Sequence, residues 1–98
     1  MKFMAMCSSG LGSSFMVEMN IQTALNKVGA TGVEVSHADL GSASATDADV
    51  FFVGRDLENS VSGFDDVVIL DSIIDQDELD RKVKATCERL GIPMNNES

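Results

Sequence analysis

The stretch that decides the fold is VFFVG, at residues 50–54. An unbroken apolar run of this kind is typical of a strand buried on both faces of a parallel sheet. DVVIL at 66–70 has the same character, and KFMAM at 2–6 is a short, mostly apolar stretch. GVEVS at 32–36 alternates between apolar and other residues, which indicates a further strand. The chain therefore has a predicted strand in each of four places.

Helical patterns lie between these strands. The first predicted helix begins near Ser14, and its apolar residues share one face at helical spacing: Val17, Ile21, Ala24, Leu25 and Val28. Ser13 or Ser14 can supply the N-cap oxygen, and Gly29 stands where a C-cap glycine is expected. A second, short helix is expected from Arg55 to Gly63. The polar stretch 37–49 is expected to be a loop.

The last helix has the clearest signals. Asp75 with Glu78 resembles a capping box, and Asp77 adds negative charge to the first turn, where the helix dipole favours it. Gly91 and Pro93 end the helix. Its predicted buried stripe consists of Leu79, Val83, Thr86 and Leu90, with Cys87 beside it as a packing residue.

Strands that alternate with helices predict an α/β fold: a four-stranded parallel sheet with helices on both faces, joined by right-handed crossovers. The chain has 98 residues, so we expect one domain over 1–92, followed by a disordered tail at 93–98. In such sheets ligands bind at the carboxyl ends of the strands. The loop after residues 2–6 begins at that edge.

The charge balance limits the partners. Sixteen acidic residues against seven basic ones give a formal charge of −9. Such a surface repels nucleic-acid phosphates and anionic lipid. It either favours a basic protein partner or serves only to keep the protein soluble. The apolar N-terminus is too short for a signal peptide or a membrane span, so no membrane insertion is expected. Cys7 and Cys87 lie far apart and form no metal-ligand pattern, which favours a reducing cytoplasm and no metal site.

The candidate site is the loop that follows the first strand. Cys7 stands at its head, and the glycines after it permit backbone conformations in which several N–H groups turn toward one point. Hydroxyl groups and the N-terminus of the following helix complete a cradle for a tetrahedral oxyanion such as phosphate. The N–H groups and the positive end of the helix dipole also favour a thiolate over a thiol. Cys7 is therefore the predicted nucleophile for a phosphoryl group. The predicted cradle consists of Ser8, Ser9, Gly10, Leu11, Gly12, Ser13 and Ser14.

The loop also lacks residues that other phosphate-handling proteins need. It has no lysine before its last serine, which a Walker-type loop requires. Low-molecular-weight tyrosine phosphatases begin a similar loop with cysteine and close it with an arginine, but Ser13 occupies that position here. We therefore expect a site that holds a phosphoryl group and passes it on. No cofactor is expected; a flavin would need flanking aromatic residues, and the chain has no Trp or Tyr.

Two further residues are candidates for accessory roles. His37, the only histidine, is expected just after the second strand, and Arg55 just after the third, both at the carboxyl edge. Either can assist the phosphoryl group, although a lone histidine in a polar loop is more often simply solvated. Apolar residues in or after the loop can form a docking surface for partner proteins: Leu11, Phe15, Met16 and Met19.

The loop resembles that of the enzyme IIB components of the bacterial phosphoenolpyruvate-dependent sugar phosphotransferase system, in particular the ascorbate and galactitol branch. Members of that branch have a short strand, a loop of the form C-G-x-G-x-G-S-S, and a helix. Residues 7–14, CSSGLGSS, keep the cysteine, two of the glycines and the closing pair of serines, and depart from the form at Ser8. The resemblance extends over the whole chain, although only the loop is specific.

This resemblance implies a fold similar to low-molecular-weight phosphatases and flavodoxin-like proteins. It also implies a cytoplasmic phosphotransferase: phosphohistidine of enzyme IIA phosphorylates Cys7, and the group then goes to a sugar carried by the membrane component, enzyme IIC. Two other readings stay open on the same fold. One is a phosphatase or arsenate-reductase-like enzyme, and the other is a non-catalytic regulatory module.

Overall fold

The computed structural model describes residues 1–7, 13–39, 44, 46–61, 63–64, 66–72 and 75–94. The elements in chain order are β1 (Lys2–Cys7), α1 (Ser13–Val28), β2 (Glu34–Asp39), β3 (Val50–Gly54), the 3₁₀ helix η1 (Arg55–Val61), β4 (Val67–Leu70) and α2 (Gln76–Leu90). All strand pairs are parallel, and the strands lie in the order β2-β1-β3-β4. The predicted α/β fold is confirmed, with a strand order of the flavodoxin-like type.

The strand that decided the prediction lies inside the sheet. Every residue of β3 is buried, as an interior strand covered on both faces should be. β4 is equally apolar in sequence, yet only Leu70 is fully buried, because β4 is an edge strand with one side unpaired. An apolar run therefore identified both strands without revealing which of them lies at the edge.

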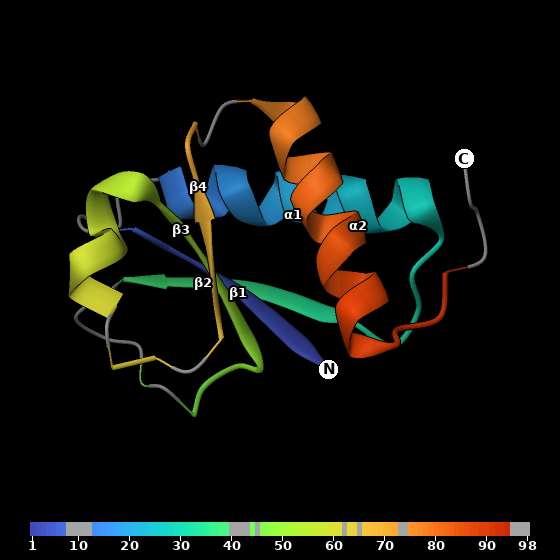
Figure 1. The fold of residues 1–98 in the computed structure, drawn as a ribbon, viewed down its shortest axis with the longest axis horizontal. Coiled ribbons are helices and arrows are strands. Elements are labelled where there is room, and N and C mark those ends of the chain that lie inside the picture. The colour runs from blue at the N-terminus through green and yellow to red at the C-terminus, as the bar shows by residue number, and fades with distance from the viewer. Residues whose placement is uncertain are drawn as a thin grey trace.

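The sheet separates two hydrophobic clusters. On one face, α1 and α2 pack together over Phe3 and Phe52, whose ring centroids lie 5.3 Å apart. On the other face, η1 covers Phe51, whose ring meets Phe64 edge-on at 4.7 Å. Figure 1 shows the two α-helices crossing each other. Helices thus cover both faces as predicted, with the two α-helices together on one of them.

The ends of the α-helices confirm most of the predicted signals. Gly29 has a φ of 67°, and the next N–H donates to the Leu25 carbonyl at 2.9 Å, which closes α1 in a Schellman motif. Gly91, with a φ of 71°, ends α2 in the same left-handed conformation. The N-cap prediction for α1 is wrong: the helix already begins at Ser13, so Ser13 and Ser14 are its first residues rather than the cap before it.

The second strand lies two or three residues later than predicted. The alternating pattern suggested 32–36, whereas β2 runs from Glu34 to Asp39 and pairs with β1 along its whole length. The polar residues at its end are typical of a loop. Since β2 is an edge strand that packs only partly into the core, it accepts such residues without losing its pairing.

The C-terminal contacts of the described chain reach Met94. The Thr31 N–H donates to the Pro93 carbonyl at 3.2 Å, and Met94 forms a bridge with Ala30 while packing against the cluster beneath the α-helices. Two residues that the sequence assigned to a tail therefore contact the domain. Residues 95–98 lie outside the described part of the chain.

Candidate functional site

Four strand ends form a row at the carboxyl edge of the sheet. Cys7 pairs with Asp39 of β2, and Gly54 of β3 pairs with Leu70 of β4. The register between β1 and β3, continued to the ends of both strands, sets Cys7 level with Gly54. Cys7 is thus the last residue of an interior strand, in the same row as the ends of its neighbours.

Cys7 also stands where the direction of the chain's crossovers reverses. β1 continues into α1 on one face of the sheet, while its neighbour β3 continues into η1 on the other face. The two connections leave the sheet on opposite faces. Open α/β sheets bind ligands at such a switch point, outside the carboxyl ends of the strands. The structure therefore places the predicted nucleophile at the topologically favoured ligand site.

In the sequence, α1 begins shortly after Cys7, at Ser13. The predicted cradle residues Ser8 to Gly12 lie outside the described residues, while Ser13 and Ser14 form the first turn of α1. That turn contains no acidic residue, so its unpaired N–H groups and the positive end of the helix dipole are not neutralised locally. A helix start of this kind favours an anion nearby.

His37 was predicted to follow the second strand, and this prediction is wrong. The residue lies within β2, two residues before the strand ends. Its Nδ1 contacts Glu18 Oε1 of α1, and the ring of Phe15 meets the imidazole edge-on, with centroids 5.5 Å apart. The structure therefore places His37 beside the first turns of α1. Its contacts there are with helix side chains.

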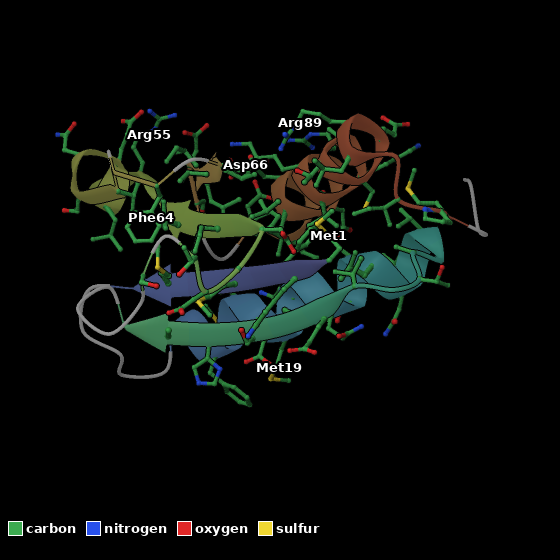
Figure 2. The ribbon with its side chains drawn as sticks, turned by 90° about the horizontal axis from the view of Figure 1, so that it is seen from below. Met1, Met19, Arg55, Phe64, Asp66 and Arg89 are labelled. Atoms are coloured by element: carbon green, nitrogen blue, oxygen red, sulfur yellow. The ribbon has the colours of Figure 1, made fainter. Side chains whose placement is uncertain are left out.

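Arg55 is the first residue of η1, immediately after β3, as predicted. Its Nε donates to Asp71 Oδ1 at 2.7 Å, and its guanidinium lies 3.7 Å from the Glu58 carboxylate. The hydrogen bond that Arg55 donates to Asp71 raises the pKa of Arg55 above its ordinary value. Arg55 thus binds the end of β4, whereas His37 lies beside α1, so the two accessory candidates occupy opposite flanks of the Cys7 row (compare Arg55 and Met19 of α1 in Figure 2).

Glu78 is a structural anchor of this edge that the sequence pattern does not predict. The residue is buried, with 6% exposure, and its two carboxylate oxygens accept hydrogen bonds from the backbone N–H groups of Asp71 at 2.7 Å and Ser72 at 2.9 Å. Lys82 Nζ lies 2.9 Å from the same carboxylate. The hydrogen bond from Lys82, with those from the backbone, lowers the pKa of Glu78 to about 2.

Half of the predicted capping box is consequently wrong. Asp75 Oδ1 does accept from the Glu78 N–H at 3.1 Å, but the Glu78 side chain does not return to the backbone of Asp75. It turns to the preceding residues and fixes the segment that leaves β4. Its spacing to Lys82 signalled only a surface ion pair. The burial depends on how residues 71 and 72 fold back over α2.

Two negative findings apply to the described residues alone. Among them, no helix has the length and apolarity needed to cross a bilayer. Within the same ranges, no three side chains of His, Cys, Asp or Glu come together as metal ligands would.

The fold and a family comparison together define the class of protein. Residues 2–94 match the family model described as the lactose/cellobiose specific IIB subunit of the PTS system. Because this match covers nearly the whole chain, the chain belongs to that family of phosphotransferase-system IIB subunits. It is accordingly a phosphoryl-transfer component of a sugar phosphotransferase system, with IIA and IIC components as its general partners. No curated protein matches the chain significantly.

Proposed function

We propose that Cys7 carries the phosphoryl group in this relay. The Cys7 thiolate attacks the phosphorus of a phosphohistidine on enzyme IIA; the S–P bond forms as the N–P bond breaks, and the imidazole keeps the electron pair and takes up a proton. A sugar hydroxyl, held by enzyme IIC, then attacks the same phosphorus and loses its proton. The S–P bond breaks, and the thiolate returns. The reaction is that of a protein-phosphocysteine–sugar phosphotransferase.

The observation that carries this proposal is the position of Cys7. It ends an interior strand at the point where the crossovers diverge, and the next helix starts at Ser13 without a neutralising acid in its first turn. A thiolate and a bound phosphoryl group are both anions, so both are favoured beside a helix N-terminus. Membership of the IIB family supplies the reaction class independently of this geometry.

The cradle is proposed to consist of Ser8, Ser9, Gly10, Leu11, Gly12, Ser13 and Ser14, whose N–H and O–H groups would surround the phosphoryl oxygens. This segment has no arginine to clamp a phosphate against attack by water. We therefore propose that it favours transfer over hydrolysis, which weighs against the phosphatase and arsenate-reductase readings.

His37 and Arg55 are proposed to act on the electrostatics of the same edge. Both side chains already contact carboxylates, His37 that of Glu18 and Arg55 that of Asp71. Neither side chain can therefore bind the phosphoryl group without first leaving its carboxylate. We expect substitution of either residue to change the transfer rate by less than substitution of Cys7. Such a graded effect is the expected behaviour of an accessory residue.

The branch of the IIB family to which the chain belongs, and the sugar that it helps to transport, are also matters of proposal. The form of the loop at residues 7–14 favours the ascorbate and galactitol branch, whereas the matching family model is described by lactose and cellobiose. Membrane vesicles that contain the cognate IIC component would decide between them, because only the right sugar would discharge the phosphorylated chain. We propose that this exchange takes place on the cytoplasmic side of the membrane.

The relay is tested by intact mass after incubation with phosphoenolpyruvate, the general phosphotransferase proteins and enzyme IIA. The wild type and Cys87→Ala should both gain one phosphoryl group, and Cys7→Ser should gain none. Cys87→Ala is the matched control because Cys87 is the other thiol and lies buried in α2. An adduct that survives in Cys7→Ser would reject Cys7 as the acceptor. No adduct on any variant, with IIA phosphorylated, would favour the regulatory module.

A further inference from the structure

An apolar ridge stands on the outer side of α1, close to the Cys7 edge. Phe15 is 51% exposed and Met19 is 55% exposed, which is unusual for side chains of this size in the described chain. They are four residues apart on the same helix and therefore neighbours on its surface. Figure 2 shows Met19 at the rim of the molecule, on the side opposite Arg55 and Arg89. We call these two residues the α1 ridge.

Polar contacts border the ridge on both sides. Toward β2, Glu18 contacts His37, whose imidazole also meets the Phe15 ring. Toward α2, the Gln76 side-chain amide donates to the Asn20 carbonyl at 3.2 Å. An apolar centre between polar borders is the usual composition of a protein–protein interface.

The charge near the ridge is negative. Glu18 lies beside it on α1, and Asp75 and Asp77 are exposed at the start of α2, next to the Gln76 contact. The first basic residue of α1 is Lys27, at the far end of that helix. Farther along the helical layer, Lys27, Arg81 and Lys84 line a hollow together with one acid, Asp80, which pairs with Lys27. The ridge thus occupies an acidic end of the helical layer, and basic residues gather toward the other end.

The ridge is placed to bring a partner to Cys7. β1 and α1 run in opposite directions over the same sheet, so the first turns of α1 lie at the edge where β1 ends. Phe15 is only two residues beyond the start of α1. A protein that covers the ridge therefore also reaches the carboxyl edge that contains Cys7.

We infer that the α1 ridge docks on the cytoplasmic surface of the IIC permease, an inference that rests on the relay proposed above. Cytoplasmic loops of membrane proteins carry an excess of lysine and arginine, which complements the acidic surroundings of the ridge. Anionic lipid would repel a chain of net charge −9, so the contact is with the permease itself. The apolar pair supplies the buried centre, and the acids supply attraction and orientation.

Phosphorylation by enzyme IIA and transfer to the sugar at IIC can be measured separately. Comparing the two rates shows whether the α1 ridge contacts IIC or the donor IIA. The test variant is Phe15→Ser combined with Met19→Ser, and the control is Gln22→Ala, an exposed residue on the same helix. Phosphorylation by enzyme IIA is followed in solution by intact mass. Loss of the phosphoryl group to sugar is followed with membrane vesicles that contain IIC. We expect the double variant to slow the second step about tenfold, as loss of interface anchors does, and to leave the first within about twofold.

Salt provides a second signature of the same contact. Because the attraction is between opposite charges at an exposed surface, raising the salt concentration should slow the vesicle step of the wild type. Asp77→Asn should lower the rate of that step and also reduce its dependence on salt. A vesicle step that does not respond to salt would contradict the charge complementarity.

The remaining outcomes are distinct. Slowing of the IIA step alone would assign the ridge to the donor, and unchanged rates in both steps would show that it docks neither partner; each overturns the inference. If the wild type itself gains no phosphoryl group, the relay has failed rather than the docking surface. Co-sedimentation with IIC vesicles still decides in that case: the double variant should bind less than the wild type and Gln22→Ala, and equal binding would reject the ridge.

Discussion

Glu78→Gln is the substitution that most directly probes how the carboxyl edge is held. In the native protein one buried carboxylate accepts the N–H groups of Asp71 and Ser72 and pairs with Lys82. Glutamine has almost the same shape but offers only one oxygen, and its NH₂ group would face a backbone N–H. At least one buried donor then loses its acceptor, although the packing of α2 is unchanged.

The expected loss of stability follows from these contacts. A buried hydrogen-bonding group without a partner costs about 1–3 kcal/mol. The lost attraction to Lys82 adds about 0.3–0.5 kcal/mol, the usual value for such a pair along a helix. We expect the free energy of unfolding to fall by roughly 2 kcal/mol, which for a domain of this size lowers the melting temperature by about 8–16 °C.

The assay is urea unfolding at pH 7, supported by thermal melts, with Glu88→Gln as the control. Glu88 is exposed on the same helix, so its substitution should change the free energy of unfolding by less than about 0.5 kcal/mol. Equal stability of Glu78→Gln and the wild type would refute the reasoning. A loss of unfolding free energy equal to that of Glu88→Gln would also refute it, because the Glu78 carboxylate would then contribute no more than an exposed one.

Three further predictions concern other consequences of burial in the same fold. Because the pKa of Glu78 falls from 4.5 to about 2 on folding, its ionised form stabilises the protein above pH 4.5, and this contribution is lost as the pH falls toward 2; acid melts of the wild type should therefore drop more steeply than those of Glu78→Gln. Burial raises the pKa of the Cys87 thiol, so iodoacetamide at pH 8 should label Cys87 only after unfolding, and rapid labelling of the folded protein would contradict its burial. Ile21→Ala leaves a cavity beneath α1 and should cost about 2–5 kcal/mol in urea unfolding, whereas Thr23→Ala on the exposed side should cost far less.

Much of the fold was predictable because its signals are local. The apolar run at 50–54 identified a buried strand, and Gly29 and Gly91 marked helix ends that require a positive φ. The position of Cys7 at the carboxyl edge followed from the parallel topology alone. These features depend on hydrophobic pattern and backbone sterics, which a single sequence displays directly.

The remaining features depend on contacts between distant segments. His37 was misplaced because an edge strand tolerates polar residues, and nothing in the local pattern shows which strand is at the edge. The role of Glu78 requires residues 71 and 72 to fold back over α2, which its spacing to Lys82 does not reveal. The engagement of Arg55 with Asp71 likewise depends on β3 and β4 being neighbours.

The most direct test of the central claim is to locate the phosphoryl group within the chain. After phosphorylation through enzyme IIA, brief tryptic digestion separates the segment 3–27, which contains Cys7, from the segment 85–89, which contains Cys87. The relay predicts a phosphoryl group on the first segment, bound to Cys7 in the fragment spectrum, and its disappearance when IIC vesicles and the cognate sugar are added. A phosphoryl group bound to a serine of that segment, or to any other segment, would contradict the account.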